Sequence, residues 1–291
     1  MASILAVGVA TLDWIQVVDR YPEIDSEVRA QQQFIWRGGN ATNSLAVLSQ
    51  LGHDCSWFGT LADDCFADII IADLEKYHID HSHCPRVLNS VTPTSHILLS
   101  KETSSRNITH FRCLRELLAS DYKNIDFSQW DWIHFEARNI AETLVLMRHL
   151  KQHYPNIQVS LEIEKPREDI EQLLNYADHC LFSCHYANSK GYVSAEKFLK
   201  DIQPKLTHSQ SVVCAWGSRG AMLLSSNAAY IEVPAFNVDV IDTRAAGDVF
   251  NAAFIDARIN GSDCLQSVEK ACYLAGVKCS QLGIDDLKNV P

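Results

Sequence analysis

The residues best suited to chemistry form one short segment late in the chain, running from Asp242 to Asp248. Ala245, Ala246 and Gly247 are small, so the backbone can turn tightly and bring several N–H groups near a single point. The apolar residues 249–254 follow immediately and predict a helix, whose unpaired first N–H groups and dipole would face that point. This pattern predicts an anion site suited to phosphate.

Asp248 lies at the mouth of the predicted anion site. A carboxylate in that position is stabilised in its charged form, so it could act as a general base near neutral pH. The alternative is that Asp248 only caps the helix, which is a common role for aspartate. The local pattern leaves both interpretations open.

A second segment, residues 37–43, reads Arg-Gly-Gly-Asn-Ala-Thr-Asn. Its two glycines would allow a ligand to approach the backbone closely. Asn40 and Asn43 are three positions apart at the start of a predicted helix, so both amides can point the same way and offer the donors and acceptors that suit a polyol. The alternative is a glycine turn with asparagine capping. Asp13 follows the first predicted strand, where open α/β sheets place their ligands.

Composition narrows the class of protein. The chain has 291 residues, 47% of them hydrophobic, and a net charge of -11, which is an ordinary globular composition and argues against a dedicated nucleic-acid binder. No apolar run is long enough to span a membrane. The ten cysteines form no Cys-x-x-Cys pair, and with no signal peptide they favour reduced thiols and a cytoplasmic location. The histidine spacing gives no metal site.

The second half of the chain has a regular rhythm. Strands are expected at 132–136, 158–163, 180–183 and 212–216, and helices at 141–153, 167–176, 195–202, 248–258 and 264–279. Strands that alternate with helices of this length predict a mostly parallel sheet covered on both faces.

The first half is less regular. A strand at 4–9, a helix at 40–51, a strand at 55–61 and a helix at 66–77 fit the same sheet. Strands at 27–36, 95–100 and 106–112 break the alternation and predict a small separate sheet, which we interpret as a lid. A hairpin-like pair is expected at 221–225 and 229–234.

Taken together, these segments resemble the ribokinase-like (PfkB-type) sugar kinases. The glycine-rich residues 37–40 and the Asp-Thr-x-x-Ala-Gly-Asp pattern at 242–248 match the two signature regions of that family in order and spacing, and the resemblance covers the whole chain. Within the family, the chain is most similar to the ketohexokinase (hepatic fructokinase) branch. The stretches that carry this similarity are 12–27, 132–139, 162–168, 213–216 and 275–279.

The resemblance implies a fold and an activity. The fold would be an α/β three-layer sandwich with a mostly parallel central sheet, as a single domain over 1–291 with a β lid formed by about 13–37 and 91–114. The activity would be transfer of the γ-phosphoryl of ATP to a ketohexose hydroxyl, with D-fructose to fructose 1-phosphate favoured. The alternatives are a kinase for another sugar or nucleoside, such as ribose, and a non-catalytic sugar-binding relative. Mg²⁺ is implied, a monovalent cation is often used in the family, and a homodimer through the lid is expected.

The resemblance also implies residue roles. Asp248 matches the general base, and the backbone N–H groups from Ala245 through Ala246 and Gly247 match the anion hole. Sugar-binding positions match Asp13, Asp25, Gly39, Asn40, Asn43 and Arg138, although Arg138 could instead pair locally with Glu136. Nucleotide-binding positions match Arg106, Trp216, Gly217, Ser218, Gly220 and Cys272.

Three departures from the family pattern stand out. Ala245 replaces the usual first glycine, which is harmless if the loop is helical there and costly if its φ is positive. The Asn-x-x-Glu element that assists Mg²⁺ in many members is absent, and Ser183 to Tyr186 stand about where it should be, a feature in which ketohexokinases resemble this chain. Residues 111–118 depart from the ketohexokinase pattern in the lid, which bears on the exact sugar. The charge run at 162–168 is expected to be a solvated loop rather than a metal-facing element.

Overall fold

The computed structural model describes residues 1–103, 105–206, 211–224 and 229–287. Residue 225, at the end of a predicted strand, and residue 104, within the predicted lid, lie outside these ranges.

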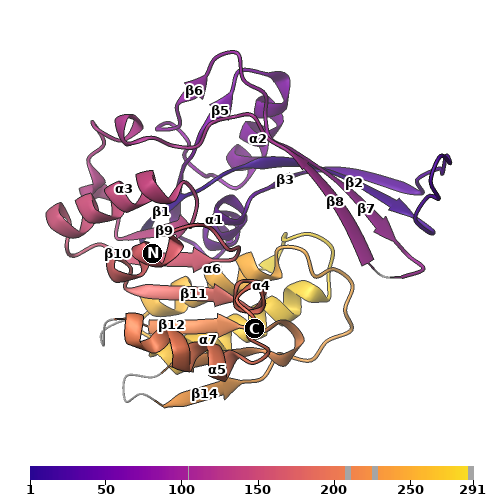
Figure 1. Cartoon of the computed structure of the whole chain (residues 1–291). Helices are drawn as coiled ribbons and strands as arrows, with labels where there is room; N and C mark the ends of the chain where they lie inside the picture. Colours follow the sequence, from indigo (N-terminus) through magenta and orange to yellow (C-terminus); the bar gives the residue numbers. More distant parts are fainter. Residues whose placement is uncertain (104, 207–210, 225–228, 288–291) are drawn as a thin grey trace.

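The main sheet has eight strands in the order β14-β13-β12-β11-β10-β9-β1-β4 (Figure 1). The six strands from β12 to β4 are mutually parallel, and β13 and β14 complete the sheet as an antiparallel pair. The strands are β1 (Ser3–Val7), β4 (Asp54–Phe58), β9 (Trp132–Glu136), β10 (Gln158–Ile163), β11 (His179–Ser183), β12 (Ser211–Ala215), β13 (Ala221–Leu224) and β14 (Tyr230–Val233).

Helices cover both faces of this sheet, because its strands are apolar on both sides. In β1, Ile4 and Ala6 enter one hydrophobic core, whereas Leu5 and Val7 enter the other. The first core is closed by α1 (Asn40–Gln50), α2 (Cys65–Lys76), α6 (Ala246–Ile259) and α7 (Cys264–Cys279). The second core is closed by α3 (Ile140–His153), α4 (Cys184–Ser189) and α5 (Ala195–Ile202). The predicted three-layer α/β architecture is therefore confirmed.

A four-stranded sheet in the order β3-β2-β7-β8 stands away from the body (Figure 1). Its strands are β2 (Thr11–Val18), β3 (Gln32–Gly38), β7 (Thr94–Ser100) and β8 (Ser105–Phe111). All seven residues of β8 are exposed, so this strand forms an open edge. A separate two-stranded sheet pairs β5 (Leu61–Ala62) with β6 (Arg86–Val87).

Several local expectations need correction. The predicted helix at 167–176 is a 3₁₀ segment, Ile170–Tyr176, which follows Pro166 and a left-handed Asp169 (φ 59°). The strand predicted at 27–36 begins only at Gln32. The strand β2 and the short helix α4 were not predicted. Other 3₁₀ turns are Ala119–Asp121, Phe127–Gln129, Gln203–Lys205 and Gly217–Arg219.

All ten cysteines are free. Among the described residues, no helix has the length and apolar character needed to cross a membrane.

Two buried histidines in the main sheet predict sensitivity to acid. The His179 ring stacks on Trp132 with centroids 4.7 Å apart and has no hydrogen-bond partner among the described residues, while His134 contacts the Ser160 hydroxyl at 2.8 Å. Burial lowers the pKa of each histidine to about 4. The unfolded chain therefore binds protons that the folded chain does not, between pH of about 6.5 and about 4.

We expect the free energy of unfolding to fall as the pH drops through that window, by about 1.4 kcal/mol per pH unit for each histidine. His179→Phe keeps the ring stacking and should flatten the slope, whereas His185→Gln, at an exposed position of α4, should not. Urea unfolding at several pH values checks this. A slope unchanged in His179→Phe would contradict it.

Candidate active site

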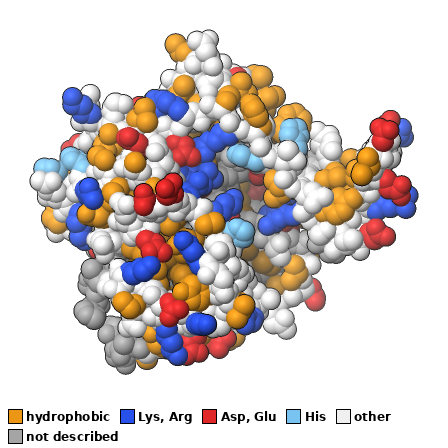
Figure 2. All heavy atoms as spheres, viewed as in Figure 1, with side chains coloured by type: hydrophobic (Ala, Val, Ile, Leu, Met, Phe, Trp, Pro, Cys, Tyr) orange, Lys and Arg blue, Asp and Glu red, His pale blue; other side chains and the backbone are white. Residues whose placement is uncertain are grey.

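One cleft of about 740 Å³ lies between the main sheet and the small sheet. Figure 2 shows this hollow, with Lys, Arg and His side chains around it. The parallel strands bring their carboxyl ends to the same edge, so Glu162 of β10, Ser183 of β11 and Ala215 of β12 all line the cleft. Helices α1 and α6 begin at this edge. It is the place where open α/β sheets bind ligands.

The loop before α6 presents free backbone donors to the cleft. The helix begins at Ala246, and Ala245 precedes it in the left-handed region, with φ 57° and ψ 7°. No described residue accepts a hydrogen bond from the N–H of Gly247 or of Asp248. The Ala245 methyl was expected to be harmless only if the loop is helical there. Ala245 has a positive φ instead, so the methyl carries a conformational cost. The backbone donors nevertheless remain available to an anion.

We expect Ala245→Gly to stabilise the protein by up to about 1 kcal/mol, because glycine adopts positive φ without the strain of a Cβ. The change in kcat should stay below about tenfold, since the backbone N–H is retained. The matched control, Ala246→Gly in the first turn of α6, should destabilise by about 0.5–1 kcal/mol. Urea unfolding compares the two. Equal destabilisation by both variants would contradict the prediction.

A buried network holds this loop from behind. The Asp242 carboxylate accepts from Arg244 Nε at 2.8 Å and pairs with Lys278 Nζ at 3.0 Å. Lys278 is 0% exposed, and its ammonium also donates to the Asp242 carbonyl at 2.7 Å. Gly283 N–H reaches the same carboxylate at 3.3 Å. Although burial opposes it, these contacts hold the pKa of Asp242 at about 2, so the hub stays ionised.

Asp248 is buried at the start of α6 and is tied to α1. Its Oδ2 accepts from Asn43 Nδ2 at 2.7 Å. Arg37, whose side chain is 1% exposed, donates to Asn43 Oδ1 at 2.9 Å and pairs with Asp73. Because Arg37 takes the amide oxygen, the Asn43 amide must turn its nitrogen toward Asp248. The orientation of this amide is therefore set by Arg37.

The environment of Asp248 favours its neutral form, so the expectation that this position stabilises the charged carboxylate is wrong. Burial raises its pKa to about 8, and the charges of Glu164 and Glu136 act in the same direction. The Asn43 hydrogen bond and the Arg37 charge oppose the rise. A carboxyl with its pKa near the working pH suits a general base.

Asp13 faces this centre from the small sheet. It lies on β2, accepts from Thr11 Oγ1 at 3.0 Å, and packs so close to Gly38 that a Cβ there would lie 2.4 Å from Asp13 Oδ2. Gly39 has φ 111°, and a Cβ added at this position would lie 2.1 Å from the Val9 carbonyl oxygen. Both positions therefore require glycine. Burial is the largest influence on Asp13 and raises its pKa.

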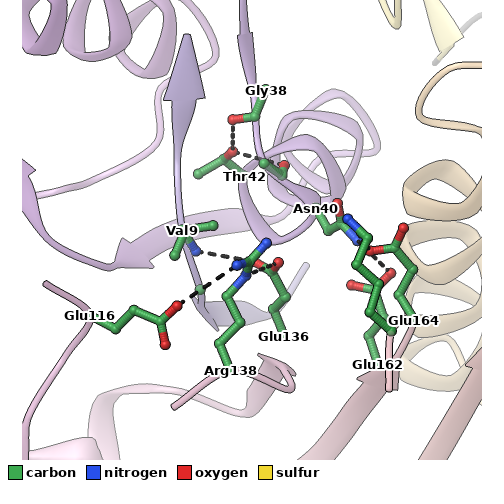
Figure 3. A network of polar contacts seen from close by, with 12 residues as sticks. Val9, Gly38, Asn40, Thr42, Glu116, Glu136, Arg138, Glu162 and Glu164 are labelled. Carbon is green, nitrogen blue, oxygen red and sulfur yellow. Dashed lines mark hydrogen bonds and ion pairs between the residues drawn. The ribbon is translucent and has the colours of Figure 1, made fainter. Parts of the chain in front are cut away.

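The carboxylates at the ends of β9 and β10 form the floor of the site (Figure 3). Glu136 accepts from Val9 N–H at 3.1 Å and from Arg138 Nε at 2.5 Å. Asn40 Nδ2 donates to Glu162 at 3.0 Å and to Glu164 at 3.1 Å. The expectation of a solvated loop at 162–168 is wrong for Glu162, which is 6% exposed, because it lies within the buried strand β10.

The cleft brings together most of the predicted residues. Those that line it are Asp13, Gly39, Asn40, Asn43, Arg106, Arg138, Ala245, Ala246, Gly247 and Asp248. Asp25 lies in an exposed turn between β2 and β3, outside the cleft of its own chain. The remaining nucleotide-binding predictions also fall outside its lining and stay predictions: Trp216, Gly217, Ser218, Gly220 and Cys272.

Sequence reasoning missed other residues of the cleft as site residues. Arg37, Glu162, Glu164, Lys165, Arg167 and Arg244 all line it. Arg37 belongs to the glycine-rich motif, and the others neighbour strand ends or the phosphate loop, which were the available signals. The chain as a whole is acidic, yet several basic side chains surround this one cleft, as a polyphosphate ligand requires. They are Arg37, Arg106, Arg138, Lys165, Arg167 and Arg244.

An eight-stranded, mainly parallel sheet with a separate four-stranded sheet facing its carboxyl edge is the ribokinase-like fold. The ribokinase of Thermotoga maritima superposes with a TM-score of 0.79 at 23% identity, over 98% of this chain and 95% of that one. A putative ribokinase from Agrobacterium tumefaciens gives a TM-score of 0.83 at 21% identity, over 97% and 92% of the two chains. These likenesses establish the fold.

The family is shown by sequence. The model of the pfkB family carbohydrate kinases matches residues 1–289, and the chain belongs to that family. Mouse ketohexokinase is 34% identical over 98% of both chains, and the ribokinase of Bacillus subtilis is 23% identical over 97% of this chain and 94% of that one. The protein is thus a PfkB-family sugar kinase, and kinases of this family use ATP.

Proposed function

We propose that this kinase transfers the γ-phosphoryl of ATP to the C1 hydroxyl of D-fructose and forms fructose 1-phosphate. The observation that carries the choice of sugar is the 34% identity to mouse ketohexokinase over nearly the whole of both chains. The polar groups that face each other across the cleft, Asp13 on one side and Asn43 with Asp248 on the other, suit a polyol between them.

In the proposed reaction, Asp248 takes the proton of the attacking hydroxyl as its oxygen bonds to the γ-phosphorus. The bond from that phosphorus to the β,γ-bridging oxygen breaks, and ADP leaves. The N–H groups of Gly247 and Asp248 stabilise the charge on the transferring phosphoryl, and Arg106 with Lys165 neutralises the phosphates. A bound Mg²⁺ would supply positive charge that offsets the negative charge of the phosphates.

We assign the remaining roles as part of the same proposal. The single domain spans 1–291, and its small sheet, within about 13–37 and 91–114, acts as a lid over the sugar. Asp25, Gly39, Asn40 and Arg138 bind the sugar. Trp216 with its neighbours Gly217, Ser218 and Gly220, and Cys272, bind the nucleotide.

We also propose that the protein is a homodimer whose subunits meet through the lid. We propose a cytoplasmic location, which the ten free thiols support. The open edge at β8 carries exposed Ile108 and Phe111, which supports pairing between copies.

A coupled ADP-release screen over fructose, tagatose, ribose and nucleosides, with and without K⁺, tests the activity. The expected result is the highest kcat/KM with D-fructose and a product whose ³¹P NMR signal couples to the C1 protons. A preference for ribose or a nucleoside would replace the proposed sugar. A chain inactive on every sugar, and active only as Ala245→Gly, would mean that the methyl closes the site.

A further inference from the structure

Two glutamates at the end of β10 present free oxygens to the cleft. Glu162 and Glu164 are two positions apart in extended chain, so their side chains lie on the same side. The amide nitrogen of Asn40 spans them and donates to Glu162 Oε1 at 3.0 Å and to Glu164 Oε2 at 3.1 Å (Figure 3). Both N–H bonds of this amide are thereby used, and one oxygen of each glutamate remains.

The remaining oxygen of Glu162 has no partner. The residue is 6% exposed, and no described residue donates a hydrogen bond to its buried Oε2. The nearby cations are engaged elsewhere, since Lys165 lies 3.5 Å from Glu164 and Arg138 pairs with Glu136. An unpartnered buried carboxylate oxygen is costly, so a ligand that supplies positive charge there would be strongly favoured.

The place of these glutamates matches a gap in the family pattern. The family's Asn-x-x-Glu element is missing, and Ser183 begins the segment that stands in its place. Ser183 Oγ donates to the backbone carbonyl of Glu164 at 2.9 Å, so the end of β10 lies directly beside that segment. The segment after β11 lacks the carboxylate of that element, and the end of the neighbouring strand β10 offers Glu162 and Glu164 instead.

We propose that Glu162 and Glu164 hold the Mg²⁺ ion of Mg·ATP in this kinase, in the role left open by the missing element. The inference rests on the proposed Mg·ATP-dependent reaction. Mg²⁺ takes oxygen ligands, and it commonly binds through one or two carboxylates together with substrate phosphates and waters. Among the described residues no group of three or more ligating side chains could hold a metal ion, so the nucleotide phosphates must complete the site.

Manganese binding measured by EPR, with Mn²⁺ as the probe for Mg²⁺, tests the proposal on the full chain without any sugar. We expect tight Mn²⁺ binding only when ADP is present. Glu162→Gln and Glu164→Gln keep an amide oxygen for Asn40 but lose the negative charge. Each should weaken Mn²⁺ binding in the ADP complex by at least about tenfold, while binding of ADP without metal stays unchanged.

Glu168→Gln, at an exposed position of the same segment, is the matched control and should bind Mn²⁺ like the wild type. If Glu162→Gln fails to fold, Glu164→Gln at a half-buried position decides the question. Wild-type Mn²⁺ affinity in the glutamine variants would overturn the proposal. Because no turnover is measured, a different sugar specificity would leave this result unaffected.

Discussion

Replacement of Asp248 by asparagine is expected to lower kcat by about 10²-fold or more. The carboxylate lies at the start of α6 beside the free N–H groups that would receive the phosphoryl, and Asn43 holds its Oδ2 at 2.7 Å. Asparagine keeps the size of the side chain but cannot take the hydroxyl proton. Fold and nucleotide binding should survive, because neither depends on that proton transfer.

Steady-state kinetics with a saturating sugar, together with ADP titration calorimetry, check this expectation. Asp169→Asn is the control, because Asp169 is exposed and asparagine tolerates its left-handed backbone. Turnover near the wild-type value in folded Asp248→Asn protein would remove Asp248 from the role of base.

The same residue predicts the pH dependence of the free enzyme. Its pKa is raised to about 8, chiefly by burial, so the basic form is lost as the pH falls through that value. We therefore expect kcat/KM for the sugar to decline as the pH drops from about 9 to about 7, up to tenfold per unit. A flat profile over this range would contradict the assignment.

Asp13→Ala is expected to reduce kcat/KM for the sugar by about 5- to 150-fold, which corresponds to about 1–3 kcal/mol for a lost buried hydrogen bond. Asp13 lies on the lid strand β2, opposite the helix starts that carry Asn43 and Asp248. The affinity for ATP should not change, because the free N–H groups of the phosphate loop belong to a different element.

Kinetics with each substrate varied in turn, and calorimetry with the nucleotide alone, separate the two effects. Asp19→Ala provides the control on the same sheet, since Asp19 is exposed beyond the end of β2. Loss of nucleotide affinity equal to the loss in sugar use would show that Asp13 is wrongly placed.

Much of the fold could be predicted because its strands are apolar on both faces. Strands such as Gln158–Ile163 stand out as short β-branched runs between helical patterns, and the structure has the same bounds. The strand β2 was missed because only three residues separate it from β1, and Asp13, which lies within it, was interpreted as a residue that follows the first strand. The helix expected at 167–176 was wrong because Asp169 adopts a left-handed conformation that periodicity does not reveal.

The site divides in the same way. The loop before α6 is contiguous, so its small residues could predict an anion site, while the local pattern left the role of Asp248 open and only the family resemblance favoured a base. Glu162 is buried within β10, between β9 and β11, and its contact with Asn40 joins residues 122 positions apart in the chain. The sequence around Glu162 gives no local sign of this contact. Charged residues near a strand end are usually solvated, so a solvated loop was the reasonable expectation.

The buried contacts of Asp242 can form only late in synthesis of the chain. Its partners Lys278 and Gly283 lie 36 and 41 positions further along the chain. During synthesis, the sheet from β1 to β12 can form while the phosphate loop still lacks both partners. A nascent chain that ends before Lys278 contains β2 and α1, but the loop before α6 lacks its buried partners. The loop before α6 therefore gains its buried support only after the chain has been synthesised past the end of α7, whereas the residues of β2 and α1 are made early in translation.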